Sequence, residues 1–152
     1  MFVCSGNTCR SPMAEGFMRY FLGLHGLTGG WNVSSSGVMA IEGLPAAELA
    51  IRVMSEHGID VSEHRSRLVS DLSPSEGSLV LGMTREHVSR MKTLLPDRGL
   101  TICLLGEASR PFYSGEAPEV PDPFGSGLSR YREVAAIIRA MTLNLARILG
   151  SG

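Results

Sequence analysis

The stretch Cys4–Pro12, with the sequence CSGNTCRSP, combines a thiol, a glycine-containing loop, a fixed cation and a helix start. The apolar run Phe2–Cys4 leads into it, and apolar side chains recur at helical spacing from Pro12 onward. We therefore expect a strand, a loop and a helix in direct succession. Because this unit is the repeating element of α/β proteins, the stretch points to the fold class.

The same alternation of patterns continues along the chain. Short apolar or alternating runs predict three further strands at residues 31–35, 78–81 and 100–104, and helical spacing predicts helices over 45–58, 85–95 and from 128 or 129 through 148. Strands that alternate with helices favour right-handed parallel crossovers. We expect one domain, residues 1–152, folded as a three-layer α/β sandwich with a four-stranded parallel sheet and helices on both faces.

Capping signals set the expected helix ends. Ser11 is expected to be the N-cap of the first helix, with Pro12 at the first helical position and the end of the helix near Gly26. Pro45 is expected in the first turn of the second helix. The long connection from Gly106 to Gly127 is rich in Pro, Gly, Ser and acidic residues, and we expect a functional loop there.

Composition and charge narrow the partners. The chain has 152 residues, 43% hydrophobic composition and a net charge of -1, so it offers no basic field for nucleic acid or for an anionic membrane. A small molecule or a phosphorylated protein is the expected partner, without nucleic acid or membrane. Neither a signal peptide nor a bilayer-spanning apolar run is visible, so a cytoplasmic protein is expected. Three cysteines without the paired spacing of a zinc site predict reduced thiols, no metal and no organic cofactor.

The loop chemistry suits a phosphate dianion. A loop with Gly6 that runs into a helix N-terminus can aim several backbone N–H groups at one point, and Arg10 adds a planar bidentate clamp. The same positive environment favours the thiolate of Cys4, which makes it a nucleophile toward phosphorus. Cys4 alone could be a small buried apolar residue at a strand end, but its neighbours favour the nucleophile. The carboxyl end of a parallel strand is also where ligands bind in such sheets.

The pattern Cys4-x-Gly6-Asn7-x-Cys9-Arg10-Ser11-Pro12-x-Ala14-Glu15 resembles the signature of the low-molecular-weight protein tyrosine phosphatase family. The resemblance continues through nearly the whole chain, in Trp31-x-Val33-x-Ser35, Gly58-Ile59-Asp60, His64-x-Ser66-Arg67 and Pro121-Asp122-Pro123-Phe124. The chain departs from the family before the first strand, where members usually carry a few more residues. Either that strand is short here or the sequence does not begin at the native start.

The resemblance implies a metal-free, two-step mechanism through a phosphocysteine on Cys4. Asp122 would donate a proton to the leaving group and then activate water, although the dipeptide Asp122-Pro123 taken alone is typical of a turn. Arg10 would hold the phosphoryl group, and the hydroxyl of Ser11 would face the thiolate. The phosphate-binding loop would comprise Ser5, Gly6, Asn7, Thr8, Cys9 and Ser11.

Other residues take supporting roles in this resemblance. Asn7, Ser35 and His64 match positions that form a hydrogen-bonded network bracing the loop. Cys9 either pairs reversibly with Cys4 on oxidation or simply packs the loop. The remaining histidines, His25, His57 and His87, are expected to be ordinary solvated side chains. Cys103 is expected in the core.

Thr8 is the residue that bears on substrate choice. Tyrosine-specific members commonly carry an aliphatic residue there, and Thr8 together with Asp122-Pro123-Phe124-Gly125 resembles the bacterial protein arginine phosphatase branch. The chain is therefore expected to prefer phosphoarginine, with phosphotyrosine as the alternative. A simple replacement of an aliphatic residue by threonine of similar shape would leave that preference unexplained. Met39 and Phe124 are expected to form pocket walls.

Two other functional classes remain more distant. Arsenate reductases use a similar loop with an additional pair of resolving cysteines, but here the remaining thiol is Cys103, in an expected strand. A non-catalytic module that binds phosphate or senses redox state would be expected to lose Cys4, Arg10 or Asp122. All three are present.

Overall fold

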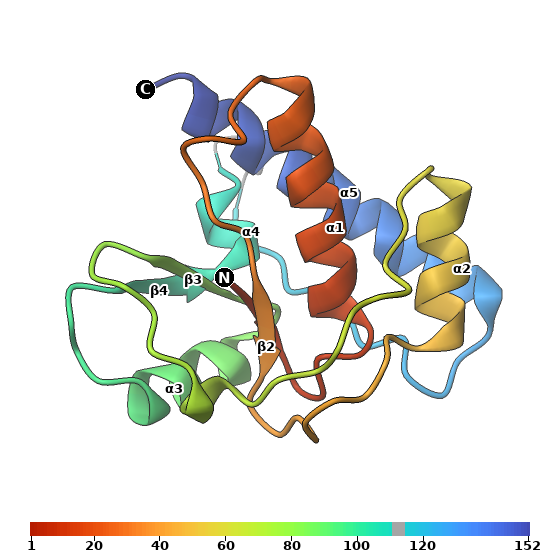
Figure 1. Cartoon of the computed structure of the whole chain (residues 1–152), viewed down its shortest axis with the longest axis horizontal. Helices are drawn as coiled ribbons and strands as arrows, with labels where there is room; N and C mark the ends of the chain where they lie inside the picture. Colours follow the sequence, from red (N-terminus) through yellow and green to blue (C-terminus); the bar gives the residue numbers. More distant parts are fainter. Residues whose placement is uncertain (111–114) are drawn as a thin grey trace.

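The computed structural model describes residues 1–110 and 115–152. Its sheet has the strand order β2-β1-β3-β4 and all neighbouring pairs are parallel, which confirms the expected four-stranded parallel sheet (Figure 1). The strands are β1 (Phe2–Cys4), β2 (Ser35–Gly37), β3 (Leu79–Gly82) and β4 (Thr101–Leu104).

Helices cover both faces of this sheet. The helices α1 and α5, with α2 beside them, lie on one face, and α3 lies on the other (Figure 1). The short α4 follows β4 directly, and a single 3-10 turn, η1, precedes β3. The helical segments are α1 (Arg10–Leu24), α2 (Glu48–Glu56), η1 (Val69–Asp71), α3 (Arg85–Leu94), α4 (Leu105–Ala108) and α5 (Leu128–Gly150). The three-layer α/β sandwich is therefore confirmed.

The core shows why β1 lies at the centre. Phe2 and Cys4 point to the large apolar cluster under α1 and α5, whereas Val3 points to a smaller cluster with Val80 and Met91 under α3. Alternate side chains of a strand face opposite sides of a sheet, so a strand buried on both faces is apolar at every position. Because β1 ends at Cys4, the sulfur lies where the strand gives way to the loop.

The second strand was expected at residues 31–35, and this was wrong. β2 begins at Ser35 and consists of small residues, while Trp31 is 43% exposed. The alternation of Trp31 and Val33 suggested a strand, but the residues that pair with β1 lie beside the loop after Cys4, where little side-chain volume fits. Close backbone approach, and not hydrophobic alternation, therefore determines this strand.

Two expected helix starts were also displaced. α1 begins at Arg10 with Cys9 in the capping position, so Ser11 is not the N-cap and Pro12 is the third helical residue. Proline fits there because the N–H groups of a first helical turn have no partner within the helix. α2 begins at Glu48, after Pro45. Because Ser11 does not cap α1, its hydroxyl is free to bond elsewhere.

The expected loop from Gly106 to Gly127 begins later, because α4 continues to Ala108. Residues 111–114 of that loop lie outside the described part. The loop returns to the sheet at Val120, whose N–H donates to the carbonyl of Met83 at 2.8 Å, just beyond β3. No helix within residues 1–110 and 115–152 is long and apolar enough to cross a membrane.

Candidate active site

The loop between β1 and α1 contains one unusual backbone conformation. Asn7 has φ of 56°, in the left-handed region that favours glycine, and its side chain is fully buried. Asparagine tolerates this region better than most residues because its short amide can bond locally. The loop therefore turns sharply at Asn7 and delivers the chain to the N-terminus of α1, where free N–H groups attract anions.

Hydrogen bonds link the turn to the sulfur of Cys4. The Ser11 hydroxyl lies 2.9 Å from Cys4 Sγ and accepts a bond from Asn7 Nδ2 at 2.8 Å. Since Asn7 supplies one proton to Ser11, the proton of Ser11 itself is available for the sulfur or for the Ser36 carbonyl, 3.3 Å away. A donor at this position stabilises a negatively charged sulfur.

The buried amide of Asn7 also ties the loop to distant segments. Asn7 Nδ2 donates to Ser35 Oγ at 3.0 Å, and Asn7 Oδ1 accepts from the N–H of Arg67 at 2.9 Å. His64 Nε2 lies 2.7 Å from the Asn7 carbonyl, and Ser35 Oγ donates to Glu15 at 2.5 Å. The structure thus brings Asn7, Ser35 and His64 together in one network around the loop.

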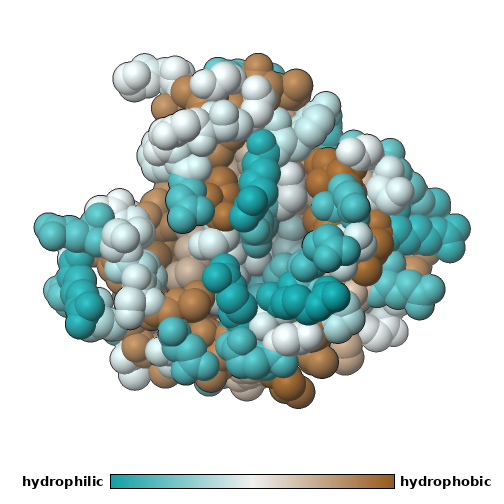
Figure 2. Space-filling view, in the orientation of Figure 1, coloured by the Kyte–Doolittle hydropathy of each residue, from teal (hydrophilic) through white to brown (hydrophobic). Residues whose placement is uncertain are grey.

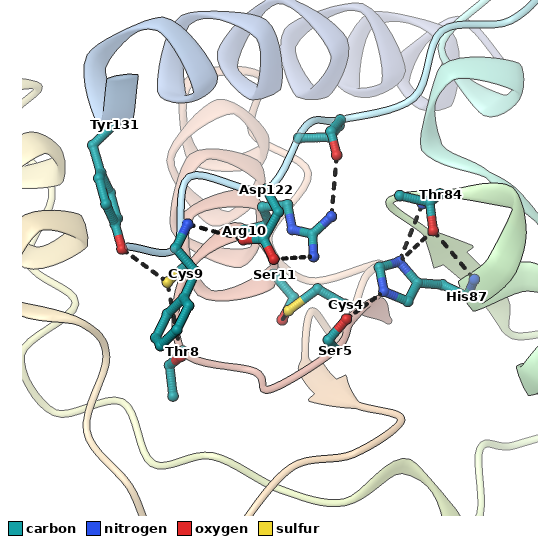
Figure 3. Close-up of polar contacts among 12 residues, drawn as sticks. Cys4, Ser5, Thr8, Cys9, Arg10, Ser11, Thr84, His87, Asp122 and Tyr131 are labelled. Carbon is teal, nitrogen blue, oxygen red and sulfur yellow. Dashed lines mark hydrogen bonds and ion pairs between the residues drawn. The ribbon is translucent and has the colours of Figure 1, made fainter. Parts of the chain in front are cut away.

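A cation and an acid meet above the sulfur (Figure 3). The buried Arg10 guanidinium donates to the Val120 carbonyl at 3.1 Å and lies 3.4 Å from Asp122 Oδ2. Asp122 is half exposed, and its other oxygen accepts from the N–H of Phe124 at 3.1 Å. Residues from the N-terminal loop and from the loop before α5 therefore form one polar site with a thiol, a cation and a carboxylate.

Thr8 and the two expected wall residues lie around this site with few contacts. Thr8 is partly buried, its Oγ1 is 3.8 Å from Cys9 Sγ, and its carbonyl accepts from the N–H of Ala47 at 2.8 Å. Met39 and Phe124 are 60% and 77% exposed. The N–H of Met39 bonds to the Ser5 carbonyl, so the backbone of Met39 borders the loop, and a wall role for its side chain stays a prediction.

Apolar side chains gather at the edge where the loop after β2 lies. Figure 2 shows hydrophobic surface along this edge, next to the polar side chains that cover most of the visible face. The exposed apolar residues of this loop are Met39, Ile41 and Leu44. The loop after β2 therefore carries exposed apolar side chains, and its backbone borders the loop after Cys4.

His87 is a site residue that the sequence reasoning missed. Its expectation as a solvated side chain is wrong, because it is 4% exposed and its Nε2 lies 2.9 Å from Ser5 Oγ. Burial, followed by the neighbouring Arg10, lowers the pKa of His87 to about 4, so the ring is neutral near pH 7. A sequence signal was available, since Thr84-x-x-His87 forms a capping box directly after β3, beside β1.

Tyr131 is the second residue missed. Its hydroxyl lies 3.1 Å from Cys9 Sγ, and burial followed by this contact raises the pKa of Tyr131. Burial likewise raises the pKa of the Cys9 thiol, so Cys9 is protonated near neutral pH. Tyr131 lies on the core-facing stripe of α5, where an aromatic residue is usually only packing. Cys103, expected in the core, is partly buried against the larger cluster.

Gly37 allows β2 to approach the loop closely because it has no side chain, and its replacement tests this packing. A Cβ at this position would collide with the Ser5 carbonyl and lie 2.9 Å from the Asn7 N and 3.0 Å from the Ala40 Cβ. We expect Gly37→Ala to lower the free energy of unfolding by about 1–3 kcal/mol and to weaken binding of inorganic phosphate, because the loop must shift. Thermal unfolding and phosphate titration measure the two effects.

Gly23→Ala is the matched control, because a Cβ at Gly23 in α1 would contact nothing within 4 Å. It should leave phosphate binding unchanged and raise stability by up to about 1 kcal/mol, since alanine favours a helix interior over glycine. Wild-type phosphate affinity in Gly37→Ala would show that the loop does not depend on close packing against β2.

Among the described residues, no group of three or more His, Cys, Asp or Glu side chains is arranged to hold a metal ion.

The chain matches the model of a known protein family. The family model described as low molecular weight phosphotyrosine protein phosphatase matches residues 1–151. The chain is 32% identical over 139 residues to a probable low molecular weight protein-tyrosine-phosphatase, EpsP, of Ralstonia nicotianae, covering 91% of this chain and 87% of that protein. It is 33% identical over 150 residues to a protein-arginine-phosphatase of Geobacillus stearothermophilus, covering 98% and 94%.

Solved structures with this fold are about as similar in sequence as these relatives. A structure of the YwlE arginine phosphatase, in a cysteine-to-serine mutant with a phosphorylated active-site serine, superposes with a TM-score of 0.83. It is 31% identical in sequence, over 97% of this chain and 93% of that one. A protein described as an arginine phosphatase therefore has this fold, and the matching family model is described by phosphotyrosine.

Proposed function

Since the chain belongs to the low molecular weight phosphotyrosine protein phosphatase family, we propose that Cys4 is its nucleophile and that phosphoarginine is its preferred substrate. The family and the relatives make it a cysteine-dependent protein phosphatase, a hydrolase that acts on phosphorylated proteins. What is proposed here is the role of each site residue and the choice between phosphoarginine and phosphotyrosine.

The position of Cys4 supports its role as the nucleophile. Its sulfur lies at the carboxyl end of the central strand, beside a hydroxyl donor on Ser11 and close to the N-terminus of α1. The hydroxyl donor and the helix N-terminus both stabilise negative charge on the sulfur, and the thiolate is the form that attacks phosphorus. The phosphorylated active-site serine in the cysteine-to-serine mutant of YwlE supports covalent transfer at the equivalent position of the fold.

Arg10 and Asp122 then have complementary roles in two steps. In the first, the Cys4 sulfur forms a bond to phosphorus as the bond to the leaving group breaks, while Arg10 holds the phosphoryl oxygens and Asp122 donates a proton to the leaving group. In the second, the Asp122 carboxylate takes a proton from water, whose oxygen bonds to phosphorus as the phosphorus–sulfur bond breaks. The Arg10–Asp122 distance of 3.4 Å places the cation and the carboxyl group side by side, within reach of one phosphoryl group and its leaving group. Free phosphate leaves, and the Cys4 thiolate is regenerated.

The hydroxyl of Thr8 is the feature of the site that favours phosphoarginine. This partly buried hydroxyl, 3.8 Å from the Cys9 sulfur, belongs to the loop around the phosphate, and a guanidino group can form hydrogen bonds that a phenol ring cannot. The chain also has arginine phosphatases of two species among its relatives at 32–33% identity. Phosphotyrosine is the second candidate, supported by the similar identity to the Ralstonia phosphatase.

The surroundings of the substrate are part of the proposal. A net charge of -1 favours a protein substrate over nucleic acid or an anionic membrane, and the cytoplasm is the compartment we propose.

A paired assay tests the substrate preference. We expect kcat/KM for a phosphoarginine-containing protein to exceed that for a phosphotyrosine peptide, because the Thr8 hydroxyl contacts the guanidino group. Thr8→Val removes the hydroxyl but keeps the shape, and should reduce the phosphoarginine-to-phosphotyrosine ratio by roughly 10-fold, the value of a hydrogen bond to a charged group. Thr8→Ile, which adds bulk, should shift the ratio further toward phosphotyrosine.

Thr8→Ser is the matched control, since it keeps the hydroxyl and should keep the preference. A strong phosphotyrosine preference in the wild-type protein would overturn the phosphoarginine proposal and leave the phosphatase activity itself intact. An unchanged ratio in Thr8→Val would show that the hydroxyl does not select the substrate.

A further inference from the structure

The contacts of His87 fix which ring nitrogen carries its proton. The backbone N–H of Thr84 lies 3.2 Å from His87 Nδ1 and can only donate, so Nδ1 is an acceptor. A neutral imidazole has one N–H, which must then be on Nε2. Because Nε2 lies 2.9 Å from Ser5 Oγ, the ring donates to the serine hydroxyl. Figure 3 shows the ring held between Thr84 on one side and Ser5 on the other.

This bond leaves the proton of the Ser5 hydroxyl uncommitted. Ser5 follows Cys4 directly, and His87 is the one side-chain partner of its hydroxyl among the described residues. Its backbone carbonyl accepts from the N–H of Met39 at 2.9 Å, so the residue is fixed at both ends. A hydroxyl that accepts from a neutral histidine must direct its own proton elsewhere, and the side chain is partly exposed.

We propose that His87 is a positioning residue that holds the Ser5 hydroxyl as a hydrogen-bond donor to an oxygen of the bound phosphoryl group. The inference rests on the proposed function, since it assumes that the loop after Cys4 binds phosphate. His87 does not touch the substrate in this scheme. Its ring sets the direction in which the Ser5 hydroxyl donates, and the Thr84 N–H fixes the tautomer of the ring.

Burial keeps the His87 ring neutral near pH 7, and the surrounding charges act in both directions. Arg10 and Arg90 oppose protonation, while Asp122 and Glu119 favour it, and burial outweighs all four. The ring therefore stays neutral down to about pH 4. Below that pH, Nδ1 carries a proton and can no longer accept from the Thr84 N–H, while Nε2 still donates to Ser5.

Two substitutions separate positioning from simple helix capping. His87→Asn places an amide oxygen near the position of Nδ1 and keeps an acceptor for Thr84, but it is too short to reach Ser5. His87→Gln places an amide nitrogen near the position of Nε2 and keeps a donor for Ser5, but loses the contact with Thr84. We expect roughly a 10-fold loss of kcat/KM and of inorganic phosphate affinity in His87→Asn, and less than about 3-fold in His87→Gln.

Ser5→Ala completes the cycle. Its kcat/KM and its phosphate affinity should fall as much as those of His87→Asn. The double variant, with both Ser5→Ala and His87→Asn, should fall no further than either single variant, because both substitutions remove the same donor. If capping alone mattered, His87→Gln would be the weaker enzyme, its thermal midpoint would fall, and Ser5→Ala would match the wild type. That result would overturn the inference.

Nitrogen NMR of wild-type His87 provides a check that needs no variant to fold. The Nε2-protonated tautomer is expected at pH 7, and an Nδ1-protonated ring would contradict the scheme. Wild-type hydrolysis separates a failure of the proposed function from a failure of the role of His87. A wild-type protein that hydrolyses neither phosphoarginine nor phosphotyrosine contradicts the proposed function, whereas an active wild type with equally active His87→Asn and Ser5→Ala contradicts the role of His87 alone.

Discussion

Cys4→Ser is expected to abolish turnover, lowering kcat by roughly ten-thousand-fold or more, because a serine hydroxyl is not ionised by the surroundings that favour a thiolate. The variant should still bind inorganic phosphate, since Arg10 and the loop backbone remain. The Ser11 hydroxyl, 2.9 Å from the sulfur, would then face a neutral oxygen. Steady-state hydrolysis and phosphate titration by calorimetry measure the two properties separately.

Cys103→Ser is the control for general loss of a thiol. Cys103 is partly buried in β4 and lies outside the loop, so this variant should keep its activity. Retained hydrolysis in Cys4→Ser would reject Cys4 as the nucleophile, and loss of phosphate binding together with loss of folding would show that the sulfur is needed for the structure of the loop.

Asp122→Asn is expected to reduce kcat for phosphotyrosine by roughly 100- to 10,000-fold, the usual range for removal of a general acid. The loss should be much smaller for an aryl phosphate whose leaving group departs without protonation. Asparagine keeps the shape of the side chain and an oxygen that can accept from the N–H of Phe124, so the loop should remain in place. Arg10 also retains its bond to the Val120 carbonyl. The dependence of kcat on the leaving group is the measurement.

Glu119→Gln is the matched control, because it removes another carboxylate of the same loop. Glu119 pairs with Arg85 and not with Arg10, so its replacement should leave kcat and its leaving-group dependence unchanged. Equal losses for all leaving groups in Asp122→Asn would show that the carboxylate positions Arg10 and does not transfer a proton. On phosphoarginine the effect also includes loss of a carboxylate that stabilises the departing guanidinium.

Much of the fold and of the polar centre could be predicted from local patterns. Strand and helix patterns are encoded by apolar spacing, so β1, β3, β4 and α5 appeared close to their expected places. Cys4 and Arg10 lie close together because one short loop carries both. The position of Asp122 beside Arg10, 112 residues away, required the family resemblance, because no local pattern brings those two segments together.

The misplaced features depend on contacts between distant segments. β2 consists of Ser35–Gly37 because the neighbouring loop admits little side-chain volume, which a hydrophobicity pattern does not record. Ser11 was expected to cap a helix, and its hydroxyl instead lies against the sulfur, because α1 begins at Arg10, two residues before the expected start at Pro12. His87 has the local pattern of an ordinary polar residue on α3. Its contact with Ser5 arises only because β3 pairs with β1.

The network around Asn7 has a consequence for folding as well as for chemistry. Its partners are Ser11, Ser35, His64 and Arg67, which lie up to 60 residues away along the chain. A left-handed turn at a non-glycine residue costs free energy, and these bonds offset the cost only after the segments have met. Helices α1 and α5 can form earlier from local interactions, yet a chain that holds its helices without this junction has no working loop. Hydrolytic activity is therefore a reporter of completed tertiary structure, and a collapsed intermediate rich in helix would be catalytically silent.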